Sequence, residues 1–184
     1  KFYISVNYQA KKIKDYFQDG HRWAVNIEYI EENKKLGTAG CLGLISDRPV
    51  EPLLVMNGDL LTGINYDVLL AFHLENHSAA TMCVREYKVQ VPFGVVKVER
   101  HRFTSIVEKP VERFFINAGV YVLNPNVLDL IEKEKYLDMP ELFERIAGSG
   151  KETTVFPLHE EWLDIGRLDD LEKAHRIING EKPL

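Results

Sequence analysis

One unbroken apolar run, Leu53–Met56, constrains the fold of this 184-residue chain more than any other feature. Such a run is typical of a strand buried on both faces of a parallel sheet, and not of a half-exposed hairpin strand. The run stops at Asn57-Gly58-Asp59. Ligands of open α/β sheets collect beyond the carboxyl ends of the strands. Asp59 is therefore our first candidate for a functional carboxylate, although Asn-Gly-Asp is also ordinary turn chemistry.

The pattern of the whole chain predicts an α/β fold built on a Rossmann-like, doubly wound and mostly parallel sheet. Apolar spacing predicts strands at residues 2–6, 25–30, 52–57 and 79–84, helices between them, strands at 94–98, 103–107, 115–123 and 153–156, and helices near 139–147 and 168–178. Alternating strands and helices imply parallel pairing. The strands at 94–98 and 103–107 have no helix between them and predict an antiparallel hairpin added to the sheet.

Composition excludes several classes of function. With 45% hydrophobic residues, the chain is long enough for a sizeable core and is expected to form one globular domain over residues 1–184. A net charge of -5 disfavours partners held by bulk electrostatics, namely nucleic acid or an anionic membrane surface. Cys41 and Cys83 are too few for a disulfide framework or a zinc site, which favours the cytoplasm. No apolar run approaches the ~20 residues that would span a bilayer.

Five short motifs occur in an order and spacing that cover nearly the whole chain. They are Leu36-Gly37-Thr38-Ala39-Gly40, Asn57-Gly58-Asp59, Pro92-Phe93-Gly94-Val95-Val96, Ile106-Val107-Glu108-Lys109-Pro110 with Ile116-Asn117-Ala118-Gly119, and Trp162-Leu163-Asp164-Ile165-Gly166. The set resembles the sugar-phosphate nucleotidylyltransferases, including the mannose-1-phosphate guanylyltransferase-like and glucose-1-phosphate thymidylyl- or uridylyltransferase-like branches.

The resemblance implies a GT-A-like nucleotidyltransferase fold and a cytoplasmic transferase of nucleotide-sugar biosynthesis. Its substrates would be a nucleoside triphosphate and a sugar 1-phosphate, and its products an NDP-sugar and pyrophosphate. A homo-oligomer is compatible with it. Asp59 and Asp164 would be catalytic carboxylates that hold Mg²⁺, which proteins usually bind through one or two carboxylates plus substrate phosphates. Lys109 would meet the sugar phosphate as a point charge. Asp164 could alternatively cap the helix expected near Leu168.

The remaining motif residues would bind the two substrates. Nucleotide-binding positions implied by the resemblance are Leu36, Gly37, Thr38, Gly40, Asn57 and Gly58. Sugar-binding positions are Gly94, Glu108, Asn117 and Gly119. Glycines at such places would let a ligand approach the backbone. Each also has an ordinary structural explanation: a helix-initiating turn at Gly37, a strand bulge at Gly94, an exposed ion pair at Glu108 and Lys109, and a buried amide at Asn117.

One departure from the family is large. The 184 residues contain neither a GxGTRLxPLT loop after the first strand nor the Pro-Lys-Pro segment that follows it. The resemblance implies that this loop wraps the triphosphate and that its arginine neutralises the leaving pyrophosphate. Losing even one preorganised donor typically costs about 10²–10³-fold in rate. We therefore expect a nucleotidyltransferase domain without its first strand and phosphate loop, and little activity from this chain alone.

Two other functional classes compete with the enzyme hypothesis. The first is a non-catalytic relative that binds nucleotide sugar as a regulatory or scaffolding subunit. The second is a metal-dependent glycosyltransferase, disfavoured because Asn57-Gly58-Asp59 lacks a paired Asp-x-Asp. His73 and His77, four residues apart on an expected helix, have a spacing that can bind metal. Without a third ligand, we interpret them as part of a solvated helix face.

Overall fold

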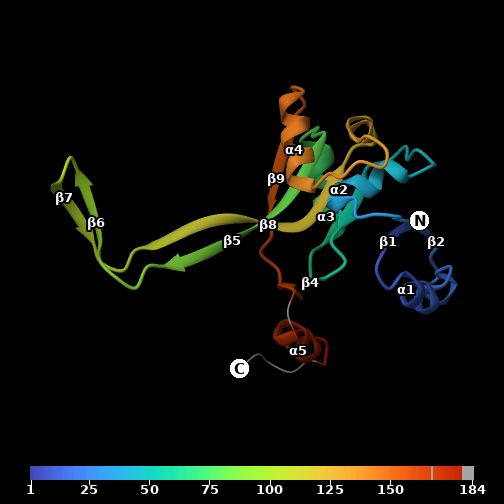
Figure 1. Ribbon diagram of the computed structural model, residues 1–184, viewed down its shortest axis with the longest axis horizontal. Coiled ribbons are helices and arrows are strands. Elements are labelled where there is room, and N and C mark those ends of the chain that lie inside the picture. Colours follow the sequence, from blue (N-terminus) through green and yellow to red (C-terminus); the bar gives the residue numbers. More distant parts are fainter. Residues whose placement is uncertain (167, 180–184) are drawn as a thin grey trace. The chain divides into compact units, whose positions relative to one another are not determined.

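The computed structural model describes residues 1–166 and 168–179, and it has a mixed α/β fold (Figure 1). Its strands are β1 (Phe2–Val6), β2 (Ile27–Glu31), β3 (Leu53–Met56), β4 (Leu60–Thr62), β5 (Ala80–Gln90), β6 (Val95–Glu99), β7 (Arg102–Val107), β8 (Val111–Leu123), β9 (Thr153–Pro157) and β10 (Trp162–Asp164). Its α-helices are α1 (Ala10–Phe17), α2 (Gly37–Gly40), α3 (Tyr66–Glu75), α4 (Met139–Gly148) and α5 (Leu168–Ile178). Short 3-10 helices cover His21–Trp23, Cys41–Leu44 and Pro125–Leu130.

The α/β class and a parallel strand pair are confirmed, but the expected grouping of the strands is wrong. β1 pairs in parallel with β2 as a two-stranded sheet, while β3 lies at the edge of a four-stranded sheet in the order β3-β8-β5-β9. Leu54 and Met56 of β3 remain 39% and 43% exposed, so the apolar run is not buried on both faces. An apolar run specifies a strand, whereas its neighbours depend on the distant chain that pairs with it.

The chain divides into two compact units. The first comprises residues 1–55, 73–81 and 122–154. Its core is apolar and is formed by side chains from β1, β2, β8, α4 and the segments around them. Buried side chains include Val6, Ile27, Ile30, Leu36, Leu42, Val122, Leu123, Val127, Leu137, Met139, Leu142 and Ile146. Met139, Leu142 and Ile146 recur at helical spacing along α4, which explains why the predicted helix near residues 139–147 forms.

A chain of hydrogen bonds surrounds the buried His73 in this first unit. Asn124 Nδ2 donates to the Ser78 carbonyl at 2.8 Å, which turns Asn124 Oδ1 toward His73 Nε2 at 3.1 Å. His73 Nδ1 then accepts from the Thr81 hydroxyl at 2.8 Å, and Thr154 links Thr81 to the Ser78 hydroxyl. His73 is only 1% exposed. Its assignment to a solvated helix face is therefore wrong, because the ring lies between Thr81 on β5 and Asn124, 51 positions away.

The second unit comprises residues 56–72, 82–121 and 155–184, described up to residue 179. It contains the predicted hairpin, which forms a separate two-stranded sheet of β6 and β7. Figure 1 shows this hairpin beyond the far ends of β5 and β8. Helix α5 confirms the last predicted helix, and Gly180, the glycine that follows it in the sequence, lies outside the described residues. In the described part of the chain, no helix is both long and apolar enough to cross a bilayer.

Candidate active site

The second unit brings Asp59 and Asp164 onto paired segments. β4 and β10 are antiparallel, with Asp164 opposite Leu60, and the Ile165 N–H donates to the Asp59 carbonyl at 2.8 Å. The two acidic segments thus lie side by side, a proximity that the structure shows for the backbone. It arises from this short antiparallel pair and not from neighbouring parallel strands. Both carboxylates are exposed, so they are accessible to a ligand.

A second group of predicted residues meets where β8 passes β3. The Asn57 N–H donates to the Gly119 carbonyl at 2.9 Å, and the Gly119 N–H donates to Asn117 Oδ1 at 2.9 Å. Gly119 has a φ of +71°, and a Cβ there would lie 2.9 Å from Asn57 Nδ2. Only glycine fits that position without strain. The Asn117 amide also donates to the Tyr121 hydroxyl at 2.7 Å, which fixes its orientation.

Gly94, Glu108 and Lys109 form a third group at the base of the β6–β7 hairpin. The Lys109 N–H donates to the Phe93 carbonyl at 3.2 Å, and a Cβ on Gly94 would lie 2.7 Å from Glu108 Oε2. Lys109 is held at φ 45°, a left-handed conformation that is uncommon for lysine and often marks a functional position. Among the described residues, no recorded contact joins this group to Asp59 or Asp164.

The Leu36–Gly40 turn lies in the first unit, packed against residues 135–139. A Cβ on Gly37 would lie 2.5 Å from the Leu137 carbonyl oxygen, and one on Gly40 would lie 2.5 Å from the Lys135 carbonyl oxygen. These glycines therefore leave space for the chain itself. We expected their missing side chains to make room for a nucleotide. That space is instead filled by the carbonyl groups of Leu137 and Lys135.

Cationic side chains line a pocket of about 580 Å³ beside β4 and β10 in the second unit. Arg85, Lys173 and Arg176 lie among apolar walls that include Leu61, Trp162 and Leu163. The Arg85 guanidinium donates to the Glu160 carbonyl at 2.7 Å and lies 5.9 Å from the centre of the Trp162 ring. Glu161 also lines the pocket, and the remaining local excess of positive charge suits an anionic substrate, despite the negative charge of the whole chain.

The pKa of Asp138 is perturbed by its contact with a predicted motif. The pKa of the Asp138 carboxyl lies below its ordinary value. The larger cause is a hydrogen bond from the Tyr136 hydroxyl, and the next is one from the Thr38 backbone N–H. The same contact raises the pKa of Tyr136. Sequence reasoning missed Asp138, Leu137 and Trp162 as partners of motif residues. Asp138 precedes a Met-Pro helix start and could have been read as a cap, but its contact with Thr38, 100 positions away, leaves no local signal.

Together these features describe a mixed α/β protein with two acidic residues on paired segments and a glycine-rich turn. The profile of the Nucleotidyl transferase family matches residues 1–181, and the chain belongs to that family. This confirms the resemblance drawn from the five motifs.

Named relatives refine the comparison. The chain is 34% identical to the "Probable mannose-1-phosphate guanylyltransferase 2" of Oryza sativa subsp. japonica, over 95% of this chain and 50% of the relative. It is 32% identical to the "Mannose-1-phosphate guanylyltransferase catalytic subunit beta" of Dictyostelium discoideum, over 91% of this chain and 48% of the relative. The chain thus spans about half the length of these relatives.

Solved structures share the fold. A putative glucose-1-phosphate thymidylyltransferase from Bacillus anthracis, in complex with a sucrose, superposes with a TM-score of 0.73 at 18% identity, covering 99% of this chain and 77% of that one. HddC from Yersinia pseudotuberculosis gives a TM-score of 0.68 at 23% identity, covering 96% and 77%.

Proposed function

We propose that this chain forms the body of a sugar-1-phosphate nucleotidylyltransferase. The proposed reaction joins the nucleoside monophosphate of a triphosphate to a sugar 1-phosphate and releases pyrophosphate. The single observation that supports the proposal is the pairing of β4 with β10, which joins the backbone segments that carry Asp59 and Asp164 in a chain that matches the family over 1–181. The names of the relatives favour GTP and mannose 1-phosphate as substrates.

Asp59 and Asp164 fit a magnesium site that the substrate completes. Within the described residues, no cluster of three or more His, Cys, Asp or Glu side chains could hold a metal. Mg²⁺ is commonly bound by one or two carboxylates plus substrate phosphates, so two exposed carboxylates on adjacent segments are a suitable donor set. Mg²⁺ bound there would neutralise negative charge on the phosphates.

The residues of the second unit would bind the sugar 1-phosphate. We assign Lys109 to the sugar phosphate and Glu108 to the sugar hydroxyls, because the Lys109 backbone is anchored to Phe93 and the missing side chain of Gly94 leaves room for the Glu108 carboxylate. Asn117 and Gly119 would provide further sugar contacts. The hydrogen bonds that fix the Asn117 amide support this role, since a preorganised amide loses little entropy on binding.

The nucleotide would be bound by the glycine-rich turn and by the residues before Asp59. We assign Leu36, Gly37, Thr38, Gly40, Asn57 and Gly58 to this role. The sugar phosphate oxygen would attack the α-phosphorus in line, so the protein mainly positions two anions and offsets their charge.

We also propose a cytoplasmic location, which is consistent with the two free cysteines. Assembly as a homo-oligomer is a separate property to be measured.

The decisive experiment compares two polypeptides. One is the 184-residue chain, and the other, called here the loop-bearing protein, is the same chain preceded by GxGTRLxPLT and Pro-Lys-Pro segments. With GTP, mannose 1-phosphate and Mg²⁺, the loop-bearing protein should release pyrophosphate at an ordinary rate of about 1–10³ per second. The chain alone should release little or none. Ordinary turnover by the chain alone would refute our account of the loop.

A non-catalytic role is the second candidate, favoured by the Leu36–Gly40 turn, where the carbonyl groups of Leu137 and Lys135 fill the space beside Gly37 and Gly40. A regulatory subunit would bind GDP-mannose or GTP without turnover. If the loop-bearing protein binds nucleotide sugar in calorimetry but releases no pyrophosphate with any substrate pair, the regulatory function replaces the enzymatic one.

A further inference from the structure

Two helix starts in the first unit cap each other. The Thr38 hydroxyl accepts a hydrogen bond from the Met139 N–H at 2.8 Å, and Asp138 Oδ1 accepts one from the Thr38 N–H at 3.0 Å. Thr38 therefore caps the start of α4, while Asp138 caps the start of α2. Helix starts leave backbone N–H groups without intrahelical acceptors, and side-chain oxygens are their usual partners. Here the two caps are exchanged between segments that are far apart in sequence.

Leu137 closes the same contact through its backbone. Its N–H donates to the Leu36 carbonyl at 2.9 Å, and its carbonyl accepts from the Ala39 and Gly40 N–H groups at 2.9 and 3.0 Å. The backbone amides of Thr38, Ala39 and Gly40 are thus all used inside the protein. They cannot serve as a phosphate cradle, unlike the free amides at many helix starts.

The carboxylate of Asp138 is held from its other side as well. The Tyr136 hydroxyl donates to Asp138 Oδ2 at 2.7 Å, so each carboxylate oxygen has a separate partner. On the opposite side of the turn, the Leu36 N–H donates to Glu32 Oε2 at 2.9 Å. The conformation of the turn is therefore fixed by contacts at both ends. Gly37, at φ +76°, lies between these two anchors.

We infer that Asp138 is a positioning residue for nucleotide binding, acting through Thr38 on the Leu36–Gly40 turn. This inference rests on the proposed function, which assigns that turn to the nucleotide. Since the N–H and hydroxyl of Thr38 are engaged with residues 138 and 139, Thr38 contributes to nucleotide affinity through the shape of the turn. Removing the Asp138 carboxylate should therefore weaken nucleotide binding and leave sugar 1-phosphate binding unchanged.

The first test measures the cap itself in the 184-residue chain. Asp138→Ala should speed amide hydrogen exchange at Thr38, and Thr38→Val should speed it at Met139. Asp138→Asn keeps one acceptor oxygen and should restore part of the protection. Glu141→Gln removes an acid from the first turn of α4 whose partner is Arg145, and serves as the matched control. Unchanged exchange at Thr38 in Asp138→Ala would overturn the inference.

The second test separates positioning from general stability. In the loop-bearing protein, Asp138→Ala should raise the KM for GTP on the order of 10- to 100-fold, with the KM for mannose 1-phosphate within about twofold of wild type. Equal increases in both KM values, or none in that for GTP, would reduce Asp138 to a structural role. If wild type transfers no nucleotide, GTP titration of the same variants decides: weaker binding by Asp138→Ala supports the inference, and equal Kd values overturn it.

Discussion

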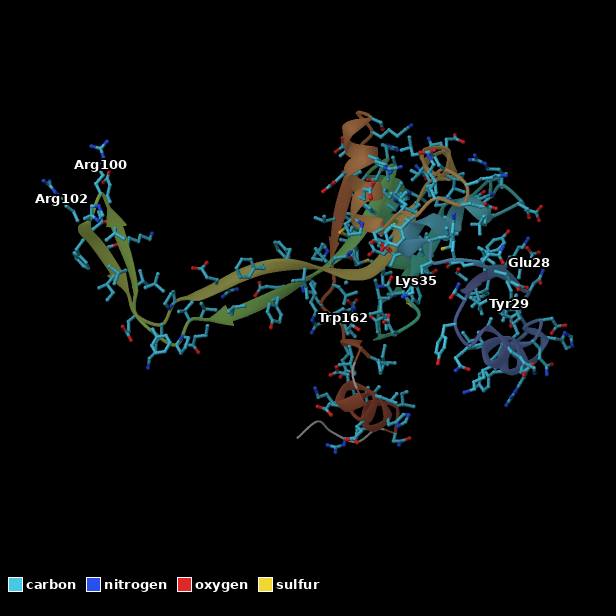
Figure 2. The ribbon with its side chains drawn as sticks, in the orientation of Figure 1. Glu28, Tyr29, Lys35, Arg100, Arg102 and Trp162 are labelled. Atoms are coloured by element: carbon cyan, nitrogen blue, oxygen red, sulfur yellow. The ribbon has the colours of Figure 1, made fainter. Side chains whose placement is uncertain are left out.

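The indole Nε1–H of Trp162 donates a hydrogen bond to the carbonyl oxygen of Ala118 at 2.8 Å, and Ala118 is fully buried. Trp162 begins β10, the strand that ends at Asp164 (Figure 2), and Ala118 lies between Asn117 and Gly119 on β8. This bond therefore links the acidic strand to the segment proposed to bind the sugar.

Trp162→Phe should lower the free energy of unfolding by about 1–3 kcal/mol, because the aromatic packing is largely kept while the hydrogen bond to a buried carbonyl is lost. Chemical denaturation of the 184-residue chain measures this. Trp23→Phe is the matched control, since the Trp23 indole N–H has no recorded acceptor in the described part of the chain. An equal loss of stability in both variants would contradict the assigned role of the Trp162 bond.

Asp59→Asn keeps the side-chain shape and removes a negative charge from the proposed magnesium site. In the loop-bearing protein, we expect kcat to fall at least about 10²-fold, with a much smaller change in the KM for sugar 1-phosphate. Initial rates of pyrophosphate release over a magnesium titration would measure both. Asp67→Asn, in the first turn of α3, provides a control acid. A kcat within twofold of wild type would remove Asp59 from the site.

Lys109→Ala should raise the KM for sugar 1-phosphate about tenfold, because a charged contact made already in the ground state is lost. Arg100→Ala is the matched control: Arg100 is a cation with nearly the same left-handed backbone, φ 43° against 45° for Lys109. Figure 2 shows Arg100 at the tip of the β6–β7 hairpin, away from the base that carries Lys109. Similar KM values for the two variants would speak against a phosphate contact at Lys109.

His73→Ala should destabilise the first unit by about 1–3 kcal/mol or more, because Thr81 and Asn124 lose a buried partner. The exposed His77 offers a control on the same segment, and His77→Ala should change stability by less than about 0.5 kcal/mol. Urea denaturation at pH 7 distinguishes them. If both substitutions proved equally mild, the buried hydrogen-bond chain would not contribute to stability.

The cap at Asp138 predicts a pH dependence with a definite sign. Its pKa is lowered in the folded protein from an ordinary value of 3.8, first by the Tyr136 hydroxyl and then by the Thr38 N–H. The stabilisation is therefore present above about pH 4 and is lost as pH falls through the lowered pKa. As the pH falls from about 4 through the lowered pKa of Asp138, the wild-type protein should lose more stability than the Asp138→Asn variant. Parallel stability curves for the two proteins would show that the carboxylate charge does not matter.

Local patterns predicted most elements but few of their partners. The spacing of Met139, Leu142 and Ile146 was sufficient for α4, and two apolar runs with no helix between them for the β6–β7 hairpin. The neighbours of Leu53–Met56 and the burial of His73 were not predictable, since both depend on segments distant in sequence.

In the candidate site, too, some residues could be recognised from the sequence and others could not. Asp59 and Asp164 were found because each belongs to a short motif whose residue types fit the chemistry. Their shared role was expected only from the resemblance, and the antiparallel β4–β10 pair that joins their segments was not predicted. Asp138 belongs to no such motif, and its role depends on a contact with Thr38 that spans 100 positions.

That separation has a consequence for synthesis of the protein. A four-residue helix such as Gly37–Gly40 has almost no stability of its own, because helix nucleation is unfavourable. Residues 137–139, which supply its hydrogen-bond partners, leave the ribosome 100 positions later. At about 5–20 residues per second, the turn waits roughly 5–20 s before these partners have been translated. Throughout that interval the nascent chain exposes an unformed glycine-rich segment, and this part of the fold can be completed only after residues 137–139 have been translated.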